Sequence, residues 1–213
     1  IHKNDSQKFI PYEKLAIGYV YPNGNAIGGP LIGVGVYMAE GLTNLDKETG
    51  QGLPAFNWTY GAHAVEVEVD VETGEFTILK IASAFDVGQV LNYESLKGQV
   101  IGGIIQGLGT AICERYVYDA KGRLLNNSFT DNKIPTAKDI PLVIVPMFIE
   151  TPHNKGAYGA RGAAEHPMIS VAPAIGNAIR DALGIDITEM PIRSEDVWKA
   201  LKKKELVFER TAV

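Results

Sequence analysis

Residues 64–81 have the sequence AVEVEVDVETGEFTILKI, and this stretch decides the fold. Valines alternate with acidic residues over 64–70, which is typical of a strand with one buried face and one solvent-exposed face. Glu72-Thr73-Gly74 has the composition of a turn, and residues 76–81 return as a second run of β-favouring residues. The stretch therefore predicts a β-hairpin.

Downstream of the hairpin, residues 94–115 (ESLKGQVIGGIIQGLGTAICER) predict a helix that contains five glycines. Its apolar residues recur at intervals of three and four, which places them on one stripe of a helix. Each interior glycine costs roughly 1 kcal/mol relative to alanine, so the pattern indicates that another backbone or a ligand approaches closely. Gln99 and Gln106 share a face and could point their amides at such a ligand. Alternatively, they could cap backbone groups in a helix that packs tightly on a sheet.

Other segments predict strands and helices in no regular order. Residues 116–125 predict a second hairpin, and residues 142–149 predict a strand buried on both faces, in which Pro146 places a bulge or an edge. Two further helices are expected to begin at Ser170 and Ser194, which are good N-cap residues. Hairpins interleaved with helices predict an α+β fold, in which helices pack on one side of a mixed sheet.

Composition argues against several classes of function. A formal net charge of −5 without a dense Lys/Arg stripe argues against a nucleic-acid partner. Cys113 is the only cysteine, which excludes an internal disulfide and a thiolate metal cluster and leads us to expect a reducing, cytoplasmic setting. The sequence contains no long apolar run, so we expect no membrane span. It also contains no leader pattern, so we expect no signal peptide. Because the first residue is Ile1 rather than Met, we expect a segment of a longer polypeptide.

Residues Asn154–Pro167 (NKGAYGARGAAEHP) predict a loop of small residues that ends in a carboxylate just before a helix. Its three glycines and four alanines leave main-chain N–H groups accessible to a ligand. Glu165, among these small residues beside an apolar helix, could be partly desolvated and hence basic enough for proton transfer. Alternatively, it only occupies a position near a helix N-terminus, where negative charge is favoured.

The sequence lacks the common catalytic motifs. It contains no nucleophile elbow, phosphate-binding P-loop, GxGxxG after a strand or paired metal-ligand spacing, so each histidine is expected to be an ordinary loop or strand-end residue. What remains is the loop with Glu165, the glycine-rich helix, and a polar loop that contains Asp86, Gly88 and Asn92. Together these segments could bind an anionic cofactor through backbone N–H groups and amides while presenting one acid.

Three runs in this sequence occur in an order that is specific in combination: GQVIGGIIQG (98–107), TDNKIPT (130–136) and GARGAAE (159–165). In these runs the chain resembles the C-terminal part of the molybdopterin-binding subunit of the xanthine dehydrogenase and aldehyde oxidase family. The resemblance is good over 60–201 and weak over 1–59. We therefore expect residues 1–213 to be a fragment of that subunit's C-terminal molybdopterin-binding domain.

This resemblance implies the fold of a molybdenum cofactor-binding domain. It also implies hydroxylation, with water-derived oxygen, of a carbon in an N-heterocycle, an aldehyde or a related substrate. Glu165 would be the general base. The cofactor would be molybdopterin, alone or as a dinucleotide, with its molybdenum held by the pterin sulfurs and not by this chain. Its contacts would come from seven residues: Gln99, Asp86, Gly88, Asn92, Arg161, Gly162 and Ala163.

The resemblance implies partners as well. A 2Fe–2S cluster and FAD would reside on other domains or subunits, the rest of the molybdopterin subunit would complete the pocket, and the chain alone would not turn over its small-molecule substrate. Ala164 stands where many family members carry glycine, and Arg161 where many carry lysine, so loop conformation and charge near the pterin could differ. The sequence leaves one alternative open, a non-catalytic assembly or binding domain that keeps the fold without the cofactor.

Overall fold

The computed structural model describes residues 3–11, 14, 16, 18–30 and 32–211. The chain forms two compact units, Ile1–Leu42 and Thr43–Val213. Strands β1 (Tyr19–Val20) and β2 (Ala26–Ile27) form a short antiparallel hairpin in the first unit. The second unit contains every site residue that the sequence predicts.

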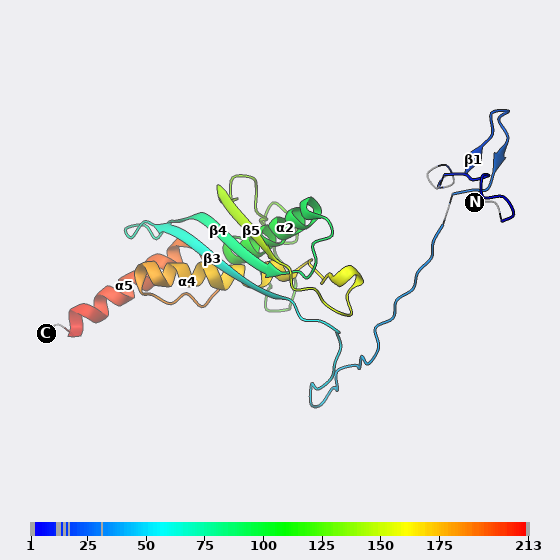
Figure 1. Cartoon of the computed structure of the whole chain (residues 1–213). Coiled ribbons are helices and arrows are strands. Elements are labelled where there is room, and N and C mark those ends of the chain that lie inside the picture. Colours follow the sequence, from blue (N-terminus) through cyan, green and yellow to red (C-terminus); the bar gives the residue numbers. More distant parts are fainter. Residues whose placement is uncertain (1–2, 12–13, 15, 17, 31, 212–213) are drawn as a thin grey trace. The chain divides into compact units, whose positions relative to one another are not determined.

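A three-stranded sheet forms one layer of the second unit (Figure 1). Its central strand β4 (Phe76–Asp86) pairs antiparallel with β3 (Tyr60–Val69) and parallel with β5 (Val143–Ile149). The predicted hairpin is therefore confirmed. Its turn is stabilised by Asp70, whose carboxylate accepts hydrogen bonds from the backbone N–H groups of the two turn residues Glu72 and Thr73.

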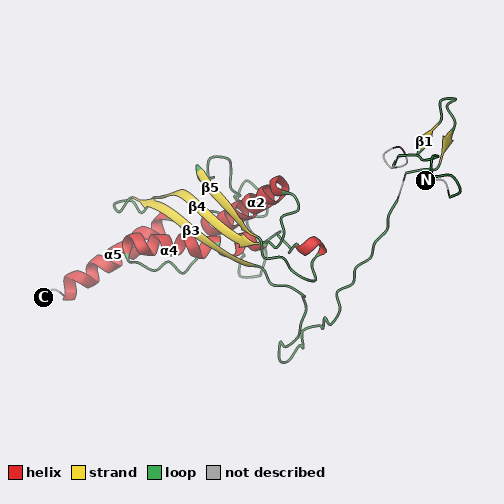
Figure 2. Cartoon of the chain, viewed as in Figure 1, coloured by secondary structure: helices red, strands yellow, loops and turns green. Residues whose placement is uncertain are grey.

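Helices pack on one side of this sheet (Figure 2), which confirms the predicted α+β class. Helix α4 contacts β3, and α2 contacts β5 and the short helix α3. Asn92 caps α2, since its side-chain oxygen accepts the N–H of Ser95 at 3.0 Å. The helical segments of the second unit are α2 (Tyr93–Ile112), η1 (Ala157–Gly159), α3 (His166–Ile169), α4 (Val171–Leu183) and α5 (Ser194–Thr211).

The core lies between the inner face of the sheet and the helices. Strand β4 contributes Ile81 and Phe85, and α2 contributes Ile104; all three side chains are buried. The core also includes residues of α4 and the start of α5, where Val197 is fully buried. Burial of this apolar surface is the main stabilising term of the unit.

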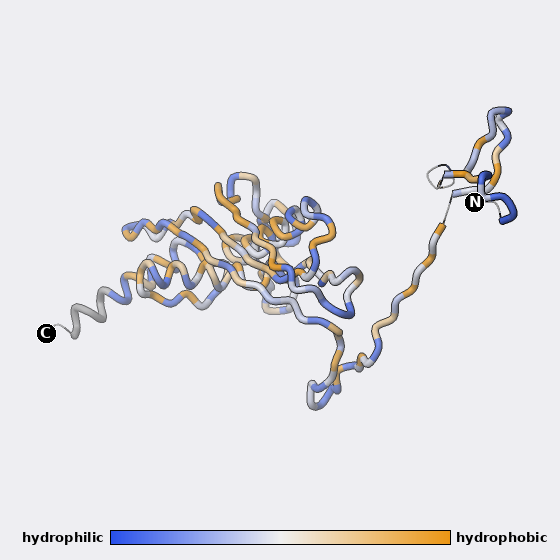
Figure 3. The backbone as a smooth tube through the Cα atoms, in the orientation of Figure 1, coloured by the Kyte–Doolittle hydropathy of each residue, from blue (hydrophilic) through white to orange (hydrophobic). Residues whose placement is uncertain are grey.

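Strand β5 differs from its prediction. The run was expected to be buried on both faces, but its side chains alternate between exposed and half-buried positions, with Val143, Val145 and Met147 on the exposed face. The physical reason is that β5 is an edge strand and helices cover only one face of the sheet. Pro146 is tolerated at this edge, as the sequence predicts. The hydrophobic run is visible in Figure 3.

Two smaller predictions were confirmed only in part. Residues 116–125 form a minimal hairpin, in which the two arms pair antiparallel at a single bridge between Tyr118 and Leu124 and the Leu125 N–H donates to the Val117 carbonyl at 2.8 Å. Asp119 holds the turn by accepting the N–H groups of Lys121 and Arg123. Both tyrosines of this segment are exposed, so no buried face supports longer strands. Ser170 precedes α4 as expected, but its side chain makes no capping hydrogen bond, since α3 ends directly before it.

The glycines of α2 lie in two environments, one tightly packed and one open. A Cβ at Gly103 would lie 2.9 Å from Cβ of Pro167, and a Cβ at Gly107 would lie 2.6 Å from the carbonyl oxygen of Met168. A Cβ at Gly98 or Gly102 would meet nothing within 4 Å. The close approach that the sequence indicates is therefore confirmed on one side of α2, where α3 packs, while the other side is bare.

We expect Gly107→Ala to destabilise the protein, because the added methyl group must displace the α3–α4 backbone, at a cost of about 1–3 kcal/mol. Gly102→Ala is the matched control, since the same change on the bare side only raises helix propensity and stabilises by up to about 1 kcal/mol. The measurement is the midpoint of thermal unfolding. Equal shifts for the two variants would contradict this packing.

Candidate functional site

The loop between β5 and α3 is fixed to the end of β4 by backbone hydrogen bonds. The N–H of Arg161 donates to the carbonyl of Val87 at 2.8 Å, and Gly88 forms a bridge with Ala160. Gly88 has a positive φ of 64°, and any side chain there would collide with the carbonyl oxygen of Gly159. The sequence-predicted residue Gly88 therefore permits a close approach of two backbone segments.

Asp86 and Arg161 brace the same loop through their side chains. The Asp86 carboxylate accepts the N–H groups of Gly88 at 3.1 Å and Thr151 at 3.2 Å, and lies 3.7 Å from Nε of Arg161. The Arg161 guanidinium also donates to the carbonyl of Trp58 at 2.7 Å. Only 12% of the Asp86 side chain and 11% of the Arg161 side chain are exposed. Both charged groups are thus engaged within the chain.

The pKa of Asp86 is shifted by these contacts. Burial alone would raise it, but the N–H donors of Gly88 and Thr151 and the charge of Arg161 together hold the pKa below its ordinary value of 3.8. The carboxylate therefore stabilises the fold fully above about pH 4, and this contribution is lost as the pH falls through the lowered pKa.

A hollow of about 150 Å³ lies between this loop and the start of α2. Asn92, Arg161 and Ala163 line it, so three predicted site residues from two distant segments come together there. Ligand pockets usually measure about 300–1,000 Å³, so the hollow alone is too small for a pterin. A larger cavity of about 640 Å³ lies at the opposite end of α2, beside Ile112, and is lined by none of the predicted residues.

The bare side of α2 carries two glutamines. Gln99 and Gln106 are exposed, and Gly98 and Gly102 flank Gln99 with open space above their backbones. Among the described residues, neither glutamine side chain has a hydrogen-bond partner. The alternative in which these amides cap backbone groups is therefore not observed, and both remain able to donate to a ligand.

Glu165 precedes α3 in a helical backbone conformation (φ −88°, ψ −14°), and its side chain makes no capping hydrogen bond. Its carboxylate is exposed and has no partner among the described residues. The partial desolvation expected from the sequence is not found within this chain, because the neighbouring alanines and glycines cover little of the side chain. Packing of Pro167 on Gly103 brings this segment against the part of α2 that carries Gln99.

The structure places the predicted residues in two groups. Asp86, Gly88 and Arg161 make the contact between this loop and the end of β4, here called the seam, and Asn92, Arg161 and Ala163 line the hollow. Gln99 lies on the bare side of α2, and Glu165 directly precedes α3. Gly162, in the loop, is exposed with nothing within 4 Å of a Cβ.

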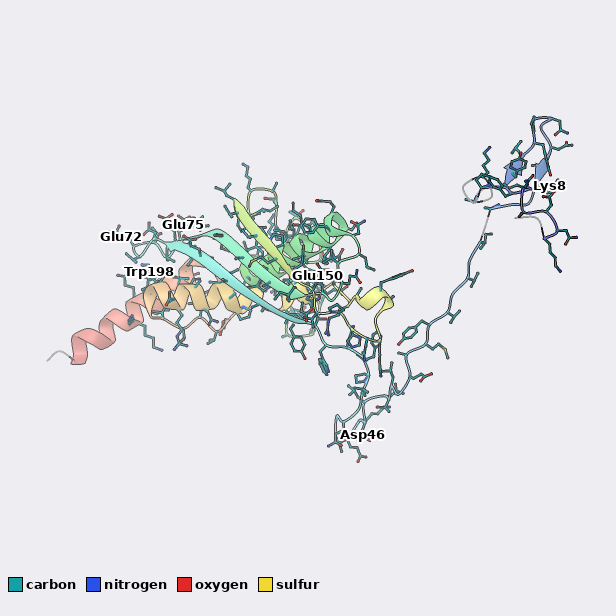
Figure 4. The ribbon with its side chains drawn as sticks, in the orientation of Figure 1. Lys8, Asp46, Glu72, Glu75, Glu150 and Trp198 are labelled. Carbon is teal, nitrogen blue, oxygen red and sulfur yellow. The ribbon has the colours of Figure 1, made fainter. Side chains whose placement is uncertain are left out.

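Sequence reasoning missed three residues that hold this loop against the end of β4. Thr151 and Trp58 act through backbone groups, which carry no sequence signal. Glu150 accepts the N–H of Val90 at 2.9 Å. It lies at the end of the sheet opposite the hairpin tip that carries Glu72 (Figure 4). Its position directly after a predicted strand was the one available hint.

Comparison with known proteins gives the family of the chain. Residues 2–141 match the model of the molybdopterin cofactor-binding domain. The chain belongs to this family. It is 34% identical over 184 residues to the aldehyde oxidoreductase of Megalodesulfovibrio gigas (86% of this chain, 20% of the relative). It is 37% identical over 145 residues to the nicotine 6-hydroxylase large subunit of Paenarthrobacter nicotinovorans (67% of this chain, 18% of the relative).

Solved structures agree with this assignment. The aldehyde oxidoreductase from Desulfovibrio gigas superimposes with a TM-score of 0.71 at 34% identity, covering 78% of this chain and 18% of that one. The molybdopterin-binding domain described here thus spans about a fifth of the length of its curated relatives. The expected resemblance to the molybdopterin subunit of the xanthine dehydrogenase and aldehyde oxidase family is confirmed.

The residues present fit a molybdopterin group. The bare backbone at Gly98, Gly102 and Gly162 admits a flat ligand, and the Gln99 amide supplies donors beside it.

In the described part of the chain, no group of three or more His, Cys, Asp or Glu could hold a metal ion. Over the same residues, no helix is long and apolar enough to cross a membrane.

We expect Asp86→Ala to loosen the seam, because the N–H groups of Gly88 and Thr151 lose their acceptor, at a cost of about 1–3 kcal/mol. Asp70→Ala is the matched control, since Asp70 also accepts two backbone N–H groups but in an exposed turn where water replaces it. The measurement is hydrogen exchange at the amides that lose the acceptor. A relative increase in exchange that is as large for Asp70→Ala as for Asp86→Ala, each compared with the unsubstituted protein, would contradict the bracing role.

Proposed function

We propose that the chain is the C-terminal part of the molybdopterin subunit of a molybdenum hydroxylase, and that it forms one wall of the cofactor site. The observation that carries this proposal is the open side of α2, where the partnerless Gln99 amide stands between bare glycines near the segment that presents the partnerless Glu165 carboxylate. An amide and a carboxylate that make no hydrogen bond within the chain, beside exposed backbone N–H groups, are able to bind a polar ligand.

In this proposal the two groups of predicted residues bind the cofactor differently. Gln99 donates its amide to the pterin or to an oxygen near the metal, and backbone groups of Arg161, Gly162 and Ala163 line the pterin. Asp86, Gly88 and Asn92 contact the pterin or its nucleotide tail. The Asp86 and Arg161 side chains already bind each other, so their main contribution is to hold the loop backbone in place.

Glu165 is the general base of the proposed reaction. When bound, the molybdenum cofactor supplies the two-electron oxidation of the substrate carbon. Glu165 accepts the proton of the water-derived hydroxyl. Its carboxylate oxygens are available for this role, since no other described residue hydrogen-bonds to them. Closure of the pocket by the rest of the subunit supplies the desolvation that this chain lacks, and a desolvated carboxylate is a stronger base.

Substrate class and partners follow from the names of the relatives. An aldehyde oxidoreductase and a nicotine hydroxylase support an aldehyde or an N-heterocycle as the substrate. The large-subunit and large-chain relatives support assembly with other subunits, to which we assign the 2Fe–2S cluster and FAD. A cofactor-free assembly domain is less favoured, because it would have no use for the partnerless Gln99 and Glu165 side chains.

We expect Glu165→Gln in the intact enzyme to abolish turnover while molybdenum stays bound, because the amide cannot accept the proton but occupies the same volume. The measurements are kcat and the molybdenum content of the purified complex. General-base removal typically costs 10²–10⁴-fold in rate.

Glu72→Gln is the matched control, since this exposed glutamate lies at the hairpin tip (Figure 4), at the other end of the sheet. The control should keep its full rate. Near-normal turnover of the Glu165 variant with molybdenum bound would remove Glu165 from the catalytic role.

A further inference from the structure

A buried polar pair lies on the inner face of the sheet, beneath the segment that carries Glu165. His63 on β3 and Ser83 on β4 are direct cross-strand partners, and Nδ1 of His63 lies 2.6 Å from Oγ of Ser83. Ser83 is completely buried and His63 is half-buried. Ser83 is the one fully buried polar side chain of the described core, so its placement calls for a partner of matching polarity.

The other ring nitrogen of His63 binds the start of α3. Its Nε2 lies 2.9 Å from the carbonyl oxygen of Pro167. A carbonyl oxygen only accepts, so Nε2 carries a proton. In the neutral ring, which burial favours, Nδ1 then accepts from the Ser83 hydroxyl, and the imidazole is the Nε2–H tautomer.

The same short helix is held from two other directions. The Pro167 ring packs on Gly103 of α2, and the His166 ring packs edge-on against Phe85, with ring centroids 4.9 Å apart. Phe85 in turn contacts the His63 ring at 5.2 Å. The two residues that follow Glu165 are therefore fixed by the sheet and α2, while the Glu165 side chain makes no hydrogen bond within the described residues.

The environment favours the neutral state of both rings. Burial lowers the pKa of His63, and the Pro167 carbonyl offsets this only in part. Burial also lowers the pKa of His166, which the Glu165 charge raises and His63 lowers. Glu165 and the two histidines are the titratable groups that act on this cluster from α3 and β3, whereas β4 presents the uncharged Ser83 and Phe85. Protonation of His63 would reverse the direction of its hydrogen bond with Ser83, since the hydroxyl would then have to accept from Nδ1–H.

We propose that Ser83 and His63 are positioning residues for Glu165. The relay from Ser83 through neutral His63 to the Pro167 carbonyl fixes the α3 turn and so sets where the preceding carboxylate stands. This inference rests on the proposed function of Glu165, but it concerns a hydrogen-bond chain that can be observed independently of turnover.

The test uses three variants of the intact enzyme. His63→Phe keeps the ring packing on Phe85 and loses both hydrogen bonds, His63→Gln keeps a donor to the Pro167 carbonyl, and Ser83→Ala removes only the donor to Nδ1. The measurements are kcat, KM, molybdenum content, and hydrogen exchange over residues 165–170, where the Met168 N–H donates to the Glu165 carbonyl at 3.0 Å.

We expect His63→Phe to lower kcat roughly tenfold or more, as when a catalytic group is misplaced, with KM and molybdenum content nearly unchanged and faster exchange over 165–170. His63→Gln should recover most of both losses. Ser83→Ala should lower kcat less than His63→Phe does, because the bond from Nε2–H to the Pro167 carbonyl is kept. A merely structural pair would not produce this graded loss or the recovery by His63→Gln.

Unchanged kcat and exchange in His63→Phe, while Glu165→Gln is inactive, would overturn the inference and leave the proposed function intact. Joint loss of molybdenum and activity in all three variants would also overturn it, because that result indicates a purely structural pair. If Glu165→Gln is active but exchange over 165–170 still responds to His63→Phe, the proposed function fails and the relay remains a determinant of α3 order only.

Discussion

The contact between Gly103 of α2 and Pro167 of α3 is the constraint on which the site depends. A proline ring within reach of a Cβ position leaves no space for any side chain on that face of α2. The contact fixes the segment that presents Glu165 against the helix that presents Gln99. Glycine at this position lowers the helix propensity of α2, but it allows two segments far apart in sequence, which carry the proposed site residues Gln99 and Glu165, to pack together.

The side chains that we propose to act on the cofactor and substrate are exposed on this chain. Gln99 and Glu165 are exposed, the hollow lined by Asn92, Arg161 and Ala163 is small, and the outer face of β5 is apolar and exposed. The chain also spans about a fifth of the length of its curated relatives. These observations fit a site whose second wall is supplied by other parts of a larger protein, where desolvation raises the strength of the same polar contacts.

Local patterns in the sequence were sufficient for the hairpin, for α2 and for its close approach to another backbone, because each depends on periodicity and glycine spacing. The burial of β5 could not be predicted, since a continuous apolar run does not show whether its strand lies at an edge. The engagement of Asp86 with Arg161 and the pairing of His63 with Ser83 depend on strand register and on loop backbone, which no local pattern encodes. The hairpin at 116–125 is limited to one bridge, because its two tyrosines are exposed and no buried face extends the pairing.

The most direct test of the central claim is an experimental structure of the full-length protein purified with its cofactor. The account predicts that the pterin lies along the bare side of α2, with the Gln99 amide and the backbone of residues 161–163 in contact with it and the Glu165 carboxylate facing the metal. A pterin bound instead in the cavity beside Ile112, with Gln99 and Glu165 left in solvent, would contradict it.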